Sequence, residues 1–115
     1  MYPYLYDGQI VIINAHCNIE DLQKDDIVVF KTEDGYAVKR NIALGGDTVS
    51  LSSNSLYINS IKVTPYTYDG TYEVVYNLEP NQYFVIGDNY RVSLDSRVFG
   101  PIEFSNIIGK VVVAF

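Results

Sequence analysis

The chain has 115 residues, of which 48% are hydrophobic, and its formal net charge is −6. A chain of this length is expected to form one domain, residues 1–115, that buries roughly two-thirds of the surface exposed by its unfolded form. Its eight lysines and arginines are scattered among fourteen acidic residues, which argues against a nucleic-acid partner because phosphate binding requires clustered positive charge.

The cysteine count and the hydropathy pattern set two further limits. Cys17 is the only cysteine, so no disulfide forms within the chain. No stretch reaches the ~20 apolar residues that span a bilayer. The opening MYPYLYDG also lacks the basic and then apolar pattern of a signal peptide. We therefore expect the chain by itself to behave as a soluble fragment.

Apolar residues recur with a period of two through the first half of the chain, which predicts strands. The expected strands cover residues 9–14, 26–31, 36–44, 47–51, 55–58 and 61–63. Ser52-Ser53-Asn54 predicts a hairpin between two of these strands, and Asn59-Ser60 predicts the turn into the last one.

The second half of the chain is less regular. Residues 64–80 are rich in tyrosine and contain Pro65 and Asp69-Gly70, which predicts a loop with one strand at residues 71–77. We expect a buried strand at residues 82–86, a loop at 90–100, one helical turn at 101–105 that begins with Pro101, and a closing strand at 107–115. The fold class is therefore mainly β, a coiled sheet or barrel-like domain with little helix.

The common sets of catalytic residues are scarce in this sequence. His16 and Cys17 are adjacent at the end of an expected strand, where neighbouring side chains point to opposite faces, so they do not form a Cys–His pair. No group of histidine, cysteine or carboxylate side chains has the spacing of metal ligands, so we expect no metal site. The Gly45-Gly46-Asp47 turn is not followed by a helix, which argues against phosphate binding.

Two segments depart from the pattern of an ordinary β domain. Lys39 and Arg40 interrupt an apolar strand and point to its opposite faces, although a charged surface strand is the commoner reading of such a pair. In residues 87–100, Ser93, Asp95 and Arg97 alternate and would share one face of an extended segment. Asp95 and Arg97 have the spacing of a charge-assisted pair that stiffens a loop, and a solvated turn is the alternative.

Together these segments resemble the bacterial type I signal peptidases. The late motif of that family, Gly-Asp-Asn-x-x-x-Ser-x-Asp-Ser-Arg-x-x-Gly, is matched in full by Gly87, Asp88, Asn89, Ser93, Asp95, Ser96, Arg97 and Gly100. Its lysine motif is matched by Lys39, Arg40, Gly46, Asp47 and Val49, with Ala43 in place of a glycine and Gly45 in place of a proline. The strand DDIVVF resembles another family segment, with Asp25 where the family has glycine, and IIGKV resembles the closing strand.

The resemblance implies a protease in which a serine hydroxyl attacks the peptide carbonyl and a lysine amine is the general base. Lys39 would be that base, and Ser93 would hydrogen-bond its amine and orient it. The family's nucleophile motif places the serine immediately before Met1, so the chain as given would be inert. Asp95 and Arg97 would support the loop that carries Ser93. Structural support would also come from Arg40, Asp88 and Asn89.

The resemblance also implies the substrate and the location. The substrates would be signal peptides of exported preproteins, with pilins left open as one class, and no cofactor would be needed. An extended peptide would add to the strand edge at Tyr36, Ala37 and Val38, and Met1 and Leu5 would help to form shallow apolar pockets. The catalytic domain would lie outside the cytoplasm, held at the cell membrane by an N-terminal anchor.

Three other readings stay open at this stage. A catalytically inactive relative would act as a chaperone or partner in surface pilus assembly, although the presence of Lys39 and Ser93 argues against it. Self-cleaving repressor proteases share Ser–Lys chemistry, but the complete motif in residues 87–100 favours signal peptidases. The third reading is a β-sheet binding domain without catalysis.

Overall fold

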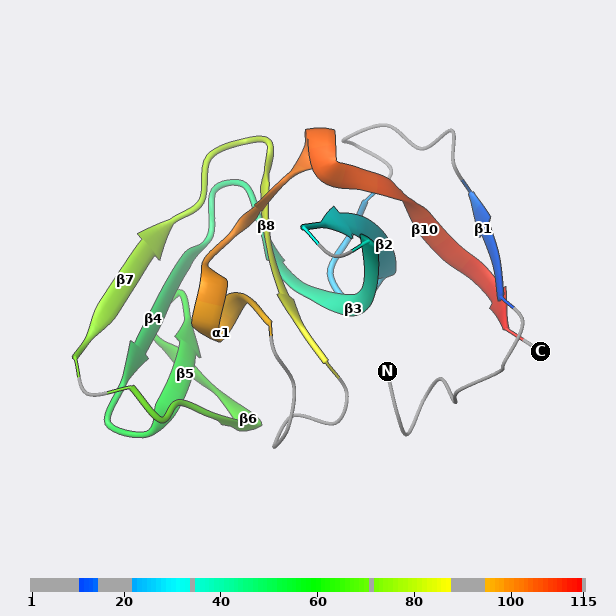
Figure 1. The fold of residues 1–115 in the computed structure, drawn as a ribbon. Helices are drawn as coiled ribbons and strands as arrows, with labels where there is room; N and C mark the ends of the chain where they lie inside the picture. The colour runs from blue at the N-terminus through cyan, green and yellow to red at the C-terminus, as the bar shows by residue number, and fades with distance from the viewer. Residues whose placement is uncertain (1–10, 15–21, 34, 71, 88–94, 115) are drawn as a thin grey trace.

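The computed structural model describes residues 11–14, 22–33, 35–70, 72–87 and 95–114, and strands dominate these segments. The strands form two antiparallel sheets that lie side by side and are joined through β3 and β8 (Figure 1). In spatial order, the six-stranded sheet consists of β1 (Val11–Asn14), β10 (Ile107–Ala114), β2 (Ile27–Thr32), β3 (Gly35–Leu44), β8 (Gln82–Ile86) and β9 (Ile102–Glu103). The four-stranded sheet consists of β6 (Ile61–Thr67), β5 (Ser55–Ile58), β4 (Thr48–Ser52) and β7 (Val74–Asn77). The prediction of a mainly β fold is confirmed.

Strand β8 contributes to two apolar cores because its successive side chains point to opposite faces. Phe84 and Ile86 belong to a first core that also receives side chains from the four-stranded sheet. Tyr83 and Val85 belong to a second core on the other face of the six-stranded sheet. Four of the five residues of β8 are buried, and Gln82 is half-buried. This burial follows because β8 has an apolar core on each of its two faces.

The hairpins of the four-stranded sheet follow from their turn residues. Strands β4 and β5 pair up to Ser52 and Ser55, which leaves Ser53 and Asn54 as a two-residue turn. Their φ angles are 50° and 65°, and those of Asn59 and Ser60 in the next turn are 52° and 70°. Two successive positive φ angles match the twist of a tight hairpin, and Asn tolerates them better than most residues. Both predicted turns are confirmed.

Two predictions for the second half of the chain are wrong in detail. Residues 64–67 continue strand β6 instead of starting a loop. Pro65 is compatible with this strand because β6 lies at the edge of its sheet, where a missing N–H breaks no ladder. The predicted helical turn at 101–105 is displaced, because Ile102–Glu103 pairs with β8 and a 3-10 turn follows at Phe104–Asn106.

A short helix lies within the segment that was predicted as a loop. Helix α1 (Ser96–Phe99) has a single turn, and Asp95 caps its N-terminus by accepting a hydrogen bond from the backbone N–H of Arg97. Four residues are too few for the apolar periodicity that identifies a helix in a sequence. The helix lies beside β8, at the junction of the two sheets (Figure 1).

The chain crosses between the sheets at two points that are hydrogen-bonded to each other. Between β3 and β4, the N–H of Gly46 donates to the carbonyl of Leu78, and the N–H of Leu78 donates to the carbonyl of Asp47. The Asp47 carboxylate also accepts hydrogen bonds from the Leu44 N–H and the Asn59 side-chain amide. Burial raises the pKa of Asp47, but these hydrogen bonds and the ion pair with Lys24 outweigh it and leave the pKa below its ordinary value. These bonds stiffen the turn without the proline that the family has there.

Gly45→Ala is expected to destabilise the protein by about 1–3 kcal/mol, as overpacking against a fixed backbone does. A Cβ at position 45 would lie 2.6 Å from the Cα of Pro80 and 2.7 Å from the carbonyl oxygen of Glu79. Urea unfolding measures the change, and Ser50→Ala on the outer face of β4 is the control, with a change within about 0.5 kcal/mol. An unfolding free energy equal to that of the wild type would show that the two crossings are not held this closely.

Candidate functional site

Lys39 lies on β3, at the point where the pairing of this strand changes. Its register partner on β2 is Val28, which belongs to the second core, so the Lys39 side chain shares the face of that core. On its other side, β3 pairs with β8 only from Arg40 onward. Lys39 is half-buried and lies one residue before the pairing of β3 with β8 begins.

The surroundings of Lys39 favour its neutral form. Burial lowers the pKa of Lys39 from the ordinary 10.5, because charge is costly to remove from water. The Asp95 carboxylate opposes this effect and raises the pKa, whereas the nearby Arg97 guanidinium lowers it further. The net result is a lowered pKa, as a lysine that accepts a proton near neutral pH requires.

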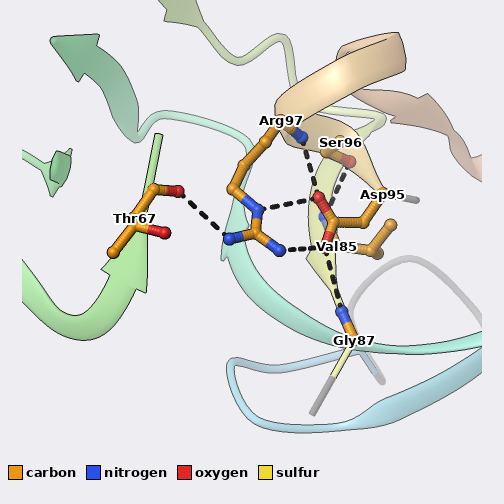
Figure 2. A network of polar contacts seen from close by, with 6 residues as sticks. All are labelled: Thr67, Val85, Gly87, Asp95, Ser96 and Arg97. Atoms are coloured by element: carbon orange, nitrogen blue, oxygen red, sulfur yellow. Dashed lines mark hydrogen bonds and ion pairs between the residues drawn. The ribbon is translucent and has the colours of Figure 1, made fainter. Parts of the chain in front are cut away.

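Asp95 and Arg97, whose charges both act on the pKa of this lysine, form a buried ion pair. Figure 2 shows the pair. The Asp95 side chain is wholly buried, and that of Arg97 is 9% exposed. One carboxylate oxygen, Oδ2, accepts from Arg97 Nη2 at 2.8 Å, and the other, Oδ1, accepts from Arg97 Nε at 3.0 Å. This two-point contact is the strongest geometry for an arginine and a carboxylate.

The ion pair also ties together three parts of the backbone. Asp95 Oδ2 accepts from the Gly87 N–H at 3.2 Å, at the end of β8. Arg97 Nη1 donates to the carbonyl of Thr67 at 3.1 Å, on β6 of the other sheet. The Ser96 hydroxyl accepts from the Val85 N–H at 2.9 Å (Figure 2). The start and the end of the segment between Gly87 and Asp95 are therefore held close together.

The structure corrects the predicted geometry of this segment. The alternation of Ser93, Asp95 and Arg97 assumed an extended chain, but Arg97 lies in helix α1. Asp95 both caps that helix and pairs with Arg97, and the complete burial of the Asp95 side chain rules out the solvated turn. Ser93, Asp88, Asn89, Met1 and Leu5 lie outside the described residues.

Ser96 belongs to the network around the ion pair, although its sequence context predicted no role for it. It is wholly buried, and its hydroxyl accepts a hydrogen bond from the Val85 N–H of β8. Its position in the matched motif was the available signal, since a small hydroxyl side chain next to a helix cap is suited to bonding with backbone.

Arg40 lies on the face of β3 opposite to Lys39. Its register partner Ile86 belongs to the first core, and its Nη1 donates to the carbonyl of Asp25 at 3.0 Å. Asp25 has a φ of 74°, in the left-handed region where glycine is favoured, which explains the glycine that the family has at this position. Aspartate is among the residues that best tolerate this region.

The first half of β3 has one open edge in the described structure. Residues 36–39 pair with β2, but no described strand pairs with them on the other side. Tyr36 is exposed, and Ala37 and Val38 are half-buried. An extended peptide that paired with this edge would pass next to Lys39.

The described residues contain no group of three or more His, Cys, Asp or Glu side chains that could hold a metal ion. No helix among these same residues is both long enough and apolar enough to cross a bilayer.

Asp95→Asn is expected to destabilise the protein by about 3–5 kcal/mol, because it leaves the Arg97 guanidinium buried without its counter-charge. The unfolding free energy in urea at neutral pH measures this loss. Lys24→Gln is the matched control, since Lys24 forms a 3.3 Å ion pair with Asp47 but is 48% exposed, and about 0–1 kcal/mol is expected. Equal effects of the two variants would contradict the importance of the buried pair.

Comparison with known proteins relates this geometry to a family. The family model described as "Signal peptidase, peptidase S26" matches residues 1–115. The chain is 39% identical over 112 residues to "Signal peptidase I S" of Bacillus subtilis (strain 168), a match that covers 84% of this chain and 61% of that protein. It is 37% identical over 139 residues to "Signal peptidase IB" of Staphylococcus aureus (strain COL), with 100% of this chain and 72% of that protein covered.

A solved structure agrees with these matches. The crystal structure of a signal peptidase I from Enterococcus faecalis V583 has a TM-score of 0.59 and 26% identity, and the match covers 79% of this chain and 97% of that one. This chain thus spans about three-fifths to three-quarters of the length of the curated relatives given above. The resemblance found in the sequence is confirmed, and residues 1–115 belong to the signal peptidase family, peptidase S26.

Proposed function

We propose that the protein carrying this chain is a serine endopeptidase that removes signal peptides from exported preproteins, with Lys39 as its general base. The observation that carries this proposal is the half-buried Lys39, whose pKa is lowered by burial and which stands at the open edge of β3. A lysine with the ordinary pKa of 10.5 is protonated at neutral pH and accepts no proton.

In the proposed reaction, a serine that precedes Met1 supplies the nucleophile. The neutral Nζ of Lys39 takes the proton from the serine hydroxyl as the oxygen attacks the carbonyl carbon of the scissile bond. The resulting ammonium then donates this proton to the nitrogen of the leaving peptide, and an acyl-enzyme remains. A water molecule, deprotonated by Lys39 in the same way, releases the signal peptide. Ser93 hydrogen-bonds the amine and orients it.

The open edge of β3 is suited to hold the substrate. A signal peptide in extended form would pair with residues 36–39, which have β2 on one side only. Its alternate side chains would then face the sheet surface next to Ala37 and Val38. Met1 and Leu5 complete apolar pockets that accept the small residues before the cleavage site.

The ion pair of Asp95 and Arg97 has a supporting role in this proposal. The Asp95 carboxylate binds the Gly87 N–H and so holds the end of the segment that contains Ser93. Asp95 raises the pKa of Lys39, and Arg97 lowers it. Arg40 braces the other face of β3 through the Asp25 carbonyl, away from the reaction. Asp88 and Asn89 support the same segment from its beginning.

The membrane location is also part of the proposal. Signal peptides emerge at the membrane, so an enzyme of this kind would be anchored there by a segment before Met1, with residues 1–115 outside the cytoplasm.

Lys39→Met in the full-length protein is expected to reduce preprotein cleavage by at least about 10²-fold, because methionine keeps the packing of the stem but accepts no proton. Cleavage of a purified preprotein in detergent, followed by gel and mass spectrometry, measures the loss. Lys62→Met removes an exposed lysine and serves as the control, with unchanged activity.

The pH dependence of the same assay tests the state of the amine. Activity of the wild type should rise with pH as Lys39 loses its proton, with a midpoint below 10.5. Cleavage that survives Lys39→Met would refute the assignment of the base. Absence of cleavage by the wild type, together with a residue other than serine before Met1, would favour the inactive partner in pilus assembly.

A further inference from the structure

Asn41 is a wholly buried polar residue in the middle of β3, two positions after Lys39. Its backbone N–H donates to the carbonyl of Asp26, and its own carbonyl accepts from the N–H of Asp25, both at 2.7 Å. Its side-chain Nδ2 donates to the carbonyl of Gln23 at 3.1 Å. Its Oδ1 has no hydrogen-bond partner, and it is the one buried side-chain atom of this kind among the described residues.

The orientation of this amide is determined by its surroundings. The carbonyl of Gln23 only accepts hydrogen bonds, so the nitrogen of the Asn41 amide must face it and the oxygen must face away. The same carbonyl accepts from the N–H of Asp26 at 3.3 Å, which places it on the β2 side of Asn41.

The register of the sheet places Lys39 on the same face of β3 as Asn41. Asn41 pairs with Val85 and Lys39 pairs with Val28, and both valines belong to the second core. The two β3 side chains therefore occupy successive positions on one face of the strand. Across β3, Asn41 neighbours Val85 on the β8 side and Asp26 on the β2 side, and along β3 itself the side-chain donor that neighbours it on this face is the Lys39 amine.

Two other cations lie near Asn41. Arg97 pairs with Asp95, and Lys110 pairs with Asp26, whose backbone carbonyl accepts from the Asn41 N–H. Lys110 is therefore the alternative donor for the Asn41 oxygen.

We propose that Asn41 is a positioning residue for Lys39, and that its Oδ1 accepts a hydrogen bond from the Lys39 Nζ when the lysine carries a proton. This inference rests on the proposed role of Lys39 as the base. An ammonium has three N–H donors and a neutral amine has two and a lone pair. Holding one N–H at Asn41 and another at Ser93 would aim the remaining position at the nucleophile.

The chemistry of an amide is suited to this task. A carbonyl oxygen is a good acceptor for an ammonium, but it carries no full charge and so does not cancel the effect of burial on the lysine pKa. An aspartate at position 41 would hold the ammonium too strongly, and an apolar residue would leave the amine without a fixed orientation. Catalytic hydrogen bonds often form fully only in the working complex, which agrees with an acceptor left open here.

The test measures the pKa of Lys39 in two variants of this chain, Asn41→Leu and Asn41→Asp. Lysines labelled with ¹³C are titrated by NMR, and the Lys39 signal is assigned by its loss in Lys39→Met. Asn41→Leu should lower the pKa of Lys39 by about one unit, because an acceptor for the ammonium is lost. Asn41→Asp should raise it by about one unit or more, because a carboxylate replaces the amide.

Controls separate positioning from a purely structural role. Leu78→Ala, in the first core, should lower the melting temperature and leave the Lys39 midpoint unchanged. If the NMR titration gives the wild-type pKa for Lys39 in both Asn41 variants, the proposal is wrong. A shift in the pKa of Lys110 in place of Lys39 would also overturn it. If Asn41→Asp does not fold, Asn41→Leu decides alone: a lower Lys39 midpoint supports the proposal, and an unchanged one overturns it.

A parallel assay distinguishes this inference from the proposed function. In the full-length enzyme, the midpoint of the pH–activity profile should move down with Asn41→Leu and up with Asn41→Asp. If the pKa of Lys39 falls in Asn41→Leu and rises in Asn41→Asp but the wild type cleaves no preprotein, the contact is supported and the protease function is rejected. If cleavage depends on Lys39 but the two Asn41 variants do not change the pKa of Lys39 in opposite directions, the function is supported and the contact is rejected.

Discussion

The buried ion pair of Asp95 and Arg97 is the interaction on which the arrangement of the site depends. Burying two charges is costly, and a pair of this kind persists only when its remaining hydrogen-bond capacity is used. Here Asp95 accepts from Gly87 and from the Arg97 backbone as well as from the guanidinium, and Arg97 also reaches Thr67. One pair of side chains thereby fixes the end of β8, the start of α1 and an edge strand of the second sheet. The position of this pair next to Lys39 follows from those same contacts.

The site also needs a lysine that gives up its proton easily, and the apolar environment of the sheet lowers the pKa of Lys39 accordingly. Lys39 lies on the face of β3 that packs into the second core, and burial is the largest influence on its pKa. The opposed effects of Asp95 and Arg97 are smaller, so the pair gives the site rigidity without restoring the ammonium. Rigid support and a dry environment thus come from different residues. A change in one of them is expected to leave the other partly intact.

The strands could be predicted from the sequence because each is long enough to show its period of two, and the hairpin turns because Asn54 and Asn59 favour positive φ. Helix α1 could not be predicted, since one turn has no periodicity, and the strand at residues 64–67 was missed because Pro65 is tolerated only at a sheet edge. The spacing of Asp95 and Arg97 predicted their pairing but not their burial, which depends on the distant strands β6 and β8. Asn41 went unnoticed because an asparagine in a strand does not reveal which face it occupies. Its burial follows from pairing with Val85, 44 positions along the chain.

The central claim is that the fold holds Lys39 where its charge is disfavoured, and the stability of Lys39→Met as a function of pH tests it most directly. The pKa of Lys39 is lower in the folded state than the ordinary 10.5, so the unfolded state binds more protons between the folded pKa and 10.5. The lysine therefore costs stability below its folded pKa, and this cost fades as the pH rises toward 10.5. We predict that Lys39→Met is more stable than the wild type in urea unfolding at neutral pH, and that the difference shrinks as the pH approaches 10.5. A variant that is less stable than the wild type at neutral pH, with a difference independent of pH, would contradict the account.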